Sequence, residues 1–205
     1  MLRKFSIIAS FSIALAGCEA STLFDEDVAG IIETDSGQID VDTDGVISTT
    51  QTILLSGSDV TTGNGYAYVI GYEPDTQLVE ARAGIATTTD LGMQPTSGAA
   101  VMTGTYEVGQ VDALDLDDDN VPMGTSTTES GTITLTADFF NETLTGSSGN
   151  LTVAGEMSDG ALTGIVTYQG LDGTLVGEIG ETDAVGAFYG HDANTVFAGG
   201  FRAAE

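Results

Sequence analysis

The sequence predicts an all-β protein, and three observations lead to this prediction. The 205-residue chain contains 28 glycines, three prolines and few apolar patterns of helical length. Over its second half, short segments alternate apolar and polar residues, as strands with one buried face do. Turn-forming residues separate these segments about every 10 residues, which is typical of a meander that closes as a barrel or a sandwich.

The N-terminal residues predict a lipoprotein signal peptide over residues 1–17. Two basic residues precede an apolar run from Phe5 to Gly17. This run is too short to span a bilayer as a helix but has the length of a signal peptide's apolar region. It ends in Leu-Ala-Gly-Cys, which resembles a bacterial lipobox with Cys18 as the lipid-carrying residue. Cys18 is the only cysteine, so it can form no disulfide within the chain.

A lipid on Cys18 implies a location in the bacterial cell envelope. Multiple acyl chains on one residue hold a protein stably at a membrane without a membrane-spanning segment. We therefore expect an outer-membrane lipoprotein that faces the periplasm or the cell surface, with the lipid as its contact with the membrane.

The charge of the chain excludes nucleic acid as a partner. From Cys18 onward, Arg82 and Arg202 face 31 acidic residues, which leaves a formal charge of −29. Nucleic-acid phosphates require a basic surface, and this chain has none. We interpret the charge as adaptation to a salty medium, where screening acts within about 10 Å. A cationic partner attracted by the field of the protein is the alternative.

The first half of the mature chain is predicted as an acidic linker with a small, irregular β-rich extension. Residues 65–74 and 77–87 read as a strand pair joined by a turn at Glu73 to Thr76. Tyr66, Tyr68 and Tyr72 lie on this pair. We expect them to be strand residues with solvated hydroxyl groups, although they could also line a ligand surface. A connector follows over 87–98.

The main β-run begins with residues 99–108. In the next segment, 131–139, Ile133 and Leu135 alternate with threonines, so one face is apolar and the other polar. Glycines within the later segments suit the bends of a small barrel. The remaining predicted strands are 151–157, 161–168, 173–180, 186–190 and 195–201, and the predicted turns are 141–150, 158–160, 171–173, 181–183 and 190–194.

Residues 95–205 resemble the β-barrel domain of bacterial lipoproteins of the transferrin-binding protein B type. That family closes its barrel with a Phe-Tyr-Gly-Pro-x-Ala-like turn and a Gly-Gly-x-Phe-like strand. Here His191 stands in place of the proline, and Thr195 in place of a frequent glutamate. The residues that fit the barrel-closing motif are Gly186, Phe188, Tyr189, Gly190, Ala193, Gly199, Gly200 and Phe201.

The resemblance implies an eight-stranded antiparallel barrel on a lipid anchor. It divides the mature chain into the extension, 18–94, and the barrel domain, 95–205. Members of the family in pathogens hold a host protein with a larger, two-lobed chain, whereas this chain has room for one lobe. The resemblance therefore implies a binding protein but does not carry transferrin binding over to this chain.

One acidic segment has the spacing of a calcium loop. Asp40, Asp42 and Asp44 occupy alternate positions, a glycine follows, and Val46 would supply a backbone carbonyl. Gln51 stands where an EF-hand has its bidentate glutamate. The alternative is an acidic, solvated turn. The similar run 115–120 lacks the glycine, and we expect it to be a solvated loop.

The single histidine, His191, argues against catalysis. One histidine excludes a zinc-binding histidine cluster, and we expect His191 to be a turn residue rather than a catalytic one. We therefore expect a binding protein and not an enzyme, which engages a protein or a small ligand. The alternatives are a scavenger of haem or another small molecule, with His191 as ligand, and a structural envelope protein stiffened by calcium. No other cofactor is expected.

Overall fold

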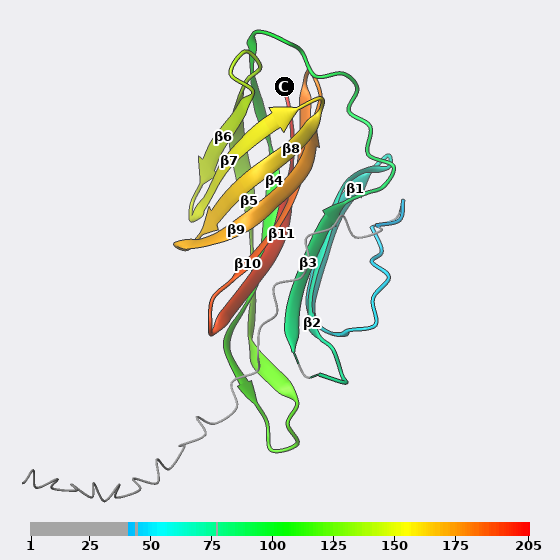
Figure 1. The fold of residues 1–205 in the computed structure, drawn as a ribbon, viewed down its shortest axis with the longest axis vertical. Helices are drawn as coiled ribbons and strands as arrows, with labels where there is room; N and C mark the ends of the chain where they lie inside the picture. Colours follow the sequence, from blue (N-terminus) through cyan, green and yellow to red (C-terminus); the bar gives the residue numbers. More distant parts are fainter. Residues whose placement is uncertain (1–40, 44, 77) are drawn as a thin grey trace, which may run out of the picture.

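The computed structural model describes residues 41–43, 45–76 and 78–205. These residues form eleven strands arranged as a closed barrel and a separate three-stranded sheet. The two parts lie side by side, and the hairpin of β4 and β5 extends beyond the barrel at one end (Figure 1). Within the described part of the chain, no helix is long and apolar enough to cross a membrane.

The barrel confirms the predicted fold. Each strand pairs antiparallel with the next along the chain, and β11 pairs with β4 to close an eight-stranded meander. Closure pairs most of the strand edges with a neighbour. Residues 122–133 of β5 pair with β4 alone, because β6 has only six residues. The strands are β4 (Ala99–Leu116), β5 (Pro122–Asp138), β6 (Thr143–Ser148), β7 (Leu151–Ser158), β8 (Ala161–Tyr168), β9 (Leu171–Ile179), β10 (Asp183–His191) and β11 (Thr195–Ala204).

Side chains fill the interior of the barrel. The rings of Phe188 and Tyr168 lie 6.4 and 5.7 Å from the ring of Phe197. Glycines on neighbouring strands make room for these rings, because a Cβ on Gly190 would lie 2.6 Å from the Phe197 ring and one on Gly199 would lie 2.9 Å from the Phe188 ring. The buried core consists of Ala100, Met102, Tyr106, Val108, Ile133, Leu135, Ala137, Phe139, Leu144, Leu151, Val153, Met157, Leu162, Val166, Tyr168, Leu175, Ile179, Ala184, Phe188, Phe197, Phe201 and Ala203.

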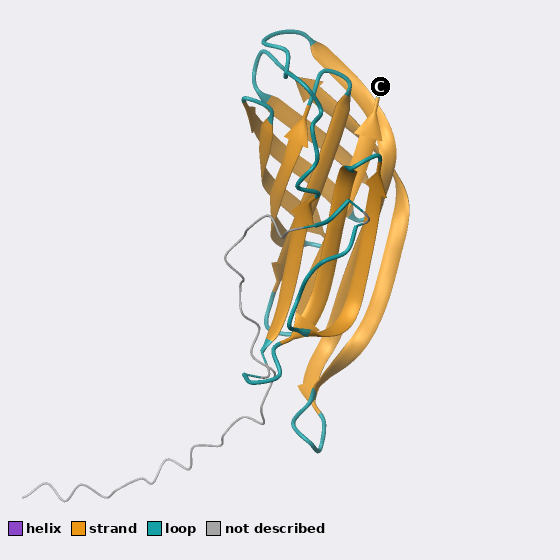
Figure 2. Cartoon of the chain, turned by 90° about the vertical axis from the view of Figure 1, so that its right-hand side faces the viewer, coloured by secondary structure: helices purple, strands orange, loops and turns teal. Residues whose placement is uncertain are grey.

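The three-stranded sheet covers part of the outer wall of the barrel. It consists of β1 (Thr52–Thr61), β2 (Asn64–Tyr72) and β3 (Val79–Ile85), in that order. The predicted strand pair corresponds to β2 and β3, whereas β1 was not predicted. The sheet packs mainly on β10 and β11, and it stands in front of them in Figure 2. As a result, β10 and β11 are buried on both faces.

Two tyrosines of β2 occupy the seam between the sheet and the barrel. Tyr66 and Tyr68 are at most 2% exposed, so the expectation of solvated hydroxyl groups is wrong for both. The wall beneath them is built of small residues. A Cβ on Gly200 would clash with the Tyr66 ring, and one on Gly109 would lie 2.7 Å from Cε2 of Tyr68. The two tyrosine rings therefore pack closely against glycine backbone of the barrel wall.

The barrel departs from the predicted segments at several places, and β4 and β10 are longer than predicted. Strand β6 lies inside 141–150, which was predicted as a turn. Its six residues are bounded by Asn and Gly, and these turn signals conceal the alternation of Leu144 with threonines and serines. Strand β9 includes the predicted turn 171–173, and β5 begins nine residues before residue 131.

The barrel begins with β4 at Ala99, and the preceding sheet ends at Ile85. The predicted boundary between two domains at residue 95 stays a prediction. The sheet before it and the barrel after it share one apolar cluster. That cluster combines residues of β2 and β3 with outward-facing residues of β4, β10 and β11.

Replacing Gly200 by valine should loosen the seam. The added side chain would overlap the Tyr66 ring, and overpacking of this kind costs about 1–3 kcal/mol. We expect urea denaturation to show that loss in the free energy of unfolding. Ala154→Val, on the exposed face of β7, is the matched control and should change stability by less than about 0.5 kcal/mol. Equal effects of the two substitutions would contradict this packing.

Candidate binding surface

Polar contacts join the sheet to the barrel at the seam. The Tyr68 hydroxyl donates a hydrogen bond of 2.8 Å to Oε1 of Glu107 on β4. Burial, and then this bond, raise the pKa of Tyr68 above its usual value. Arg202 on β11 pairs with Asp59 on β1 at 3.1 Å, and Thr105 donates to the same carboxylate. These contacts fix the position of the sheet on the wall.

A groove of about 310 Å³ lies along one end of this seam. Its size is at the lower limit of the roughly 300–1,000 Å³ of small-molecule sites. The groove is mainly polar, and it contains the Arg202–Asp59 pair. Its lining residues are Asp59, Thr61, Thr62, Asn64, Leu91, Thr103, Gly104, Thr105, Asp183, Ala184, Val185, Arg202, Ala203 and Ala204.

One end of the barrel interior is closed by a polar cluster. The hydroxyls of Tyr106 and Tyr168 donate to the two oxygens of Glu129, at 2.8 and 3.0 Å. Gln169 in turn donates to the Tyr168 hydroxyl. Burial raises the pKa of Tyr168 to about 12. The cluster satisfies its own polar groups and leaves the interior closed to a ligand at this position.

His191 ends β10 beside a shallow hollow of about 250 Å³. Tyr189 and Asp172 also line this hollow. Its volume is below the usual range for sites that enclose a small molecule. Asp192 does not act with the histidine, because its Oδ1 accepts the backbone N–H groups of Asn194 and Thr195 in the turn.

The predicted barrel-closing residues lie on β10, on β11 and in the turn between them. Phe188 and Phe201 point into the interior, whereas Tyr189 contributes to the cluster under the sheet. The pairs along these two strands are Gly186 with Phe201, Phe188 with Gly199, and Ala187 with Gly200. Gly190 is the second-to-last residue of β10, directly before His191, and Ala193 lies in the turn that follows.

The predicted calcium loop is described only in part. Asp40 and Asp44 lie outside the described residues, as does the lipid-anchor residue Cys18. Asp42 Oδ1 accepts the N–H of Val46 at 2.9 Å, so this carboxylate stabilises a turn. Calcium binding stays a prediction. Among the residues that the structure describes, no three or more His, Cys, Asp or Glu are grouped to hold a metal ion.

The acidic run after β4 forms the tip of the β4–β5 hairpin. Asp117 Oδ1 accepts the N–H groups of Asp119 and Val121, and Asp118 and Asp119 are exposed, as expected for a solvated loop.

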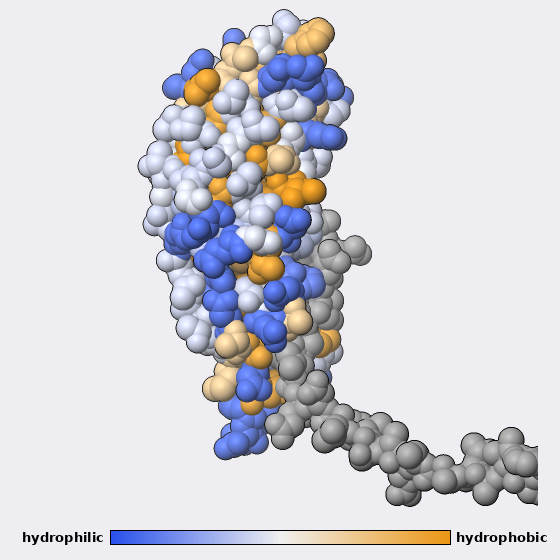
Figure 3. Space-filling view, turned by 90° about the vertical axis from the view of Figure 1, so that its left-hand side faces the viewer, coloured by the Kyte–Doolittle hydropathy of each residue, from blue (hydrophilic) through white to orange (hydrophobic). Residues whose placement is uncertain are grey.

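The surface of the described chain is negatively charged. The side of the molecule shown in Figure 3 is mostly pale, the colour of intermediate hydropathy, with blue hydrophilic patches near the top, across the middle and at the bottom. In the described chain both arginines are paired with carboxylates, Arg82 with Glu80 at 2.8 Å and Arg202 with Asp59. The remaining carboxylates therefore leave the surface negative.

Sequence reasoning missed β1, although a signal for it exists. The segment 52–61 is rich in β-branched residues but lacks clean alternation. The Thr-Gly after it, with positive φ at Thr62 and Gly63, forms a two-residue hairpin turn into β2. A search for hairpin turns would have identified this strand.

Comparisons with known proteins give structural likenesses. No family model and no curated protein matches the chain. A crystal structure of a surface lipoprotein is similar over 74% of this chain and 82% of that one, with a TM-score of 0.48 and 13% identity. Transferrin binding protein B from serogroup B Neisseria meningitidis matches over 78% of this chain, with a TM-score of 0.43 and 14% identity.

The chain spans only 38% of that transferrin binding protein. The haemoglobin receptor HpuA from Kingella denitrificans is also similar, over 67% of this chain and 54% of its own, with a TM-score of 0.38 and 15% identity. These structures include the protein type that the C-terminal sequence resembles.

Replacing Tyr68 by phenylalanine should destabilise the seam. The Glu107 carboxylate would lose its buried donor, and an unsatisfied buried group costs about 1–3 kcal/mol. Thermal denaturation should show a lower Tm. Tyr72→Phe, on the same strand but with a partly exposed side chain, should have little effect. If Tyr68→Phe were as stable as Tyr72→Phe, the hydrogen bond would not contribute to holding the sheet.

Proposed function

We propose that the chain is a lipid-anchored binding protein of the bacterial cell envelope, which engages a protein partner without catalysis. The packing of the barrel interior carries this proposal. Apolar side chains from all eight strands fill the interior, and the Glu129 cluster occupies one end of it. A ligand therefore has to bind on the outer surface.

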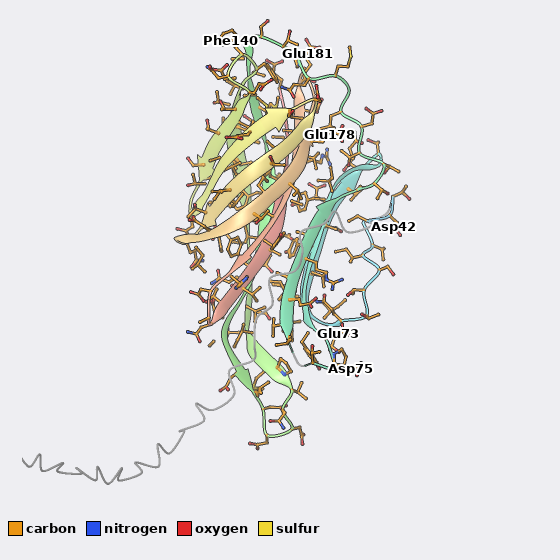
Figure 4. All side chains as sticks on the ribbon, in the orientation of Figure 1. Asp42, Glu73, Asp75, Phe140, Glu178 and Glu181 are labelled. Atoms are coloured by element: carbon orange, nitrogen blue, oxygen red, sulfur yellow. The ribbon has the colours of Figure 1, made fainter. Side chains whose placement is uncertain are left out.

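The outer surface offers features that suit a protein more than a small molecule. The hollows described above are shallow or at the lower limit of small-molecule sites. Phe140, in the turn after β5, is 76% exposed, and Met93, in the connector, is 90% exposed. Figure 4 shows Phe140 pointing outward at one end of the barrel. A protein partner that covers these side chains would remove their apolar surface from water.

The resemblance of residues 95–205 to lipoproteins of the transferrin-binding type also supports a binding role. Transferrin itself is not part of the proposal, because this chain corresponds to a fraction of the two-lobed protein. The net charge of −29 favours a partner whose contact surface is basic or neutral, since like charges across an interface are unfavourable.

A small-molecule scavenger remains the second candidate. The observation that favours it is the hollow beside His191, which both His191 and Tyr189 line. A third candidate is an envelope protein stiffened by calcium at Asp40, Asp42, Asp44 and Val46. The anchor at Cys18, the outer membrane as its location and both of these candidates are predictions.

The anchor is tested by Cys18→Ser. Without the thiol no lipid can attach, so we expect the protein to move from the membrane fraction to the soluble fraction of cells. Ser21→Ala is the matched control, which keeps Cys18 and should remain in the membrane fraction. Persistence of Cys18→Ser in the membrane fraction would contradict the lipid anchor.

The soluble Cys18→Ser protein then serves to test binding. A partner captured from the native medium should bind it saturably, and binding should be retained by His191→Ala, which would lose a small ligand held by the imidazole. Failure to find saturable binding of any protein would contradict the proposed function.

A further inference from the structure

On one side of strand β1, the backbone N–H and C=O groups have no partner in another strand of the sheet. It pairs with β2 on one side and forms the edge of the three-stranded sheet on the other. Antiparallel strands alternate between residues that bond to one neighbour and residues that bond to the other. The direction in which each residue of β1 points can therefore be derived from the bonds that β2 makes with β3.

Two bonds fix this direction. Ala86 N donates to Gly65 O, and Glu73 N donates to Leu78 O, so the odd-numbered residues of β2 bond towards β3. The even-numbered residues of β2 then bond towards β1. Their partners in the register are Leu55, Gly57, Asp59 and Thr61.

The intervening residues of β1 point their backbone groups away from the sheet. These are Ser56, Ser58 and Val60, which are spaced about 6.8 Å apart. The described residues provide no hydrogen-bond partner for their N–H and C=O groups. Ser56 and Ser58 are exposed, so these groups are accessible.

Over residues 55–61 the edge has few of the features that protect an edge strand, because the register shift of β1 lies before Leu55. Proteins prevent pairing with other chains by placing lysine, proline or exposed charge on such strands. The sequence Thr52–Thr61 contains no lysine and no proline. Its one charge, Asp59, is engaged by Arg202 and Thr105. The regular part of the strand, residues 55–61, therefore presents an edge to which another strand can pair.

A hollow of about 350 Å³ lies between residues 45–47 and strands β1 and β2. The exposed side chains of Val46 and Ile53, which are 60% and 53% exposed, stand at its rim. Alternate side chains of a paired strand could contact these apolar residues while its backbone bonds to β1. The hollow is lined by Gly45, Val46, Ile47, Ile53, Ser56, Gly57, Ser58, Tyr68 and Val69.

We propose that an extended, basic segment of a protein partner adds to the sheet as a fourth strand beside β1. Charge complementarity identifies this occupant. Asp42 and Glu73 lie on the side of the sheet that faces away from the barrel (Figure 4), and both arginines of the described chain are already paired. A second copy of the chain would carry the same excess of negative charge, with 31 acidic residues against four basic ones. This inference rests on the proposed function and specifies the site and the chemistry of the partner.

The probe is a ten-residue peptide of alternating valine and lysine, and the protein is the soluble Cys18→Ser form. Amide hydrogen exchange is measured by NMR with and without saturating peptide. We expect exchange at Ser56, Ser58 and Val60 to slow at least tenfold, because their N–H groups gain acceptors. The N–H groups of Leu55 and Gly57, which already bond to β2, should be unaffected. A peptide of alternating valine and glutamate should bind at least tenfold more weakly.

A pair of variants at one position completes the test. Ser58→Pro removes one outward N–H at an edge position where proline is tolerated, and it should weaken binding of the valine–lysine peptide at least tenfold. Ser58→Ala keeps the N–H and should bind as the parent does. Circular dichroism checks that both variants fold. Binding without slower exchange at the three amides, or equal binding by Ser58→Pro, would overturn the proposal.

The experiments distinguish failure of the β1 site from failure of the proposed binding function. A partner captured equally well by Ser58→Pro and Ser58→Ala would support the function and overturn the β1 site. Dimerisation of the protein alone, with slow exchange at the three amides before peptide is added, would overturn the basic partner in favour of a second copy.

Discussion

The structure depends on a barrel wall that is buried on both faces. Strands β10 and β11 place phenylalanines in the interior and small residues on the outside, where Tyr66 of the sheet packs against Gly200. Tyr68 packs beside it against Gly109 of β4. A closed barrel of glycine-rich strands allows this arrangement, because glycine lets a ring approach the neighbouring strand. The glycines and aromatic residues of 186–201 therefore serve the packing on both faces of this wall, the interior and the side covered by the sheet.

This arrangement determines where function can lie. The interior is occupied, and the seam is held by an apolar cluster, by the Tyr68–Glu107 hydrogen bond and by the Arg202–Asp59 pair. The barrel thus acts as a support for the sheet. Strand β1 is the part of the sheet farthest from β3, and its register on β2 fixes the direction of its free backbone groups. A rigid edge needs little ordering when a partner binds, which lowers the entropic cost of association.

The sequence was informative wherever one face of a strand is buried and the other is solvated. The alternation in 131–139 and 151–168 therefore predicted the barrel correctly. It failed at β6, where turn residues surround a short strand, and at β1, which lacks alternation because its two faces are both partly covered. The burial of Tyr66 and the pairing of Glu129 with two tyrosines depend on contacts between residues distant in sequence, which periodicity cannot indicate.

The central claim is that the sheet and the barrel form one cooperative unit. Native-state hydrogen exchange tests it most directly, by comparing Val69 in β2 with Phe197 in β11, both of which are fully buried. The account predicts that the two amides exchange only through global unfolding, with opening free energies that agree within about 1 kcal/mol. Exchange of Val69 with an opening free energy several kcal/mol lower, while Phe197 stays protected, would show that the sheet detaches from the barrel and would contradict the account.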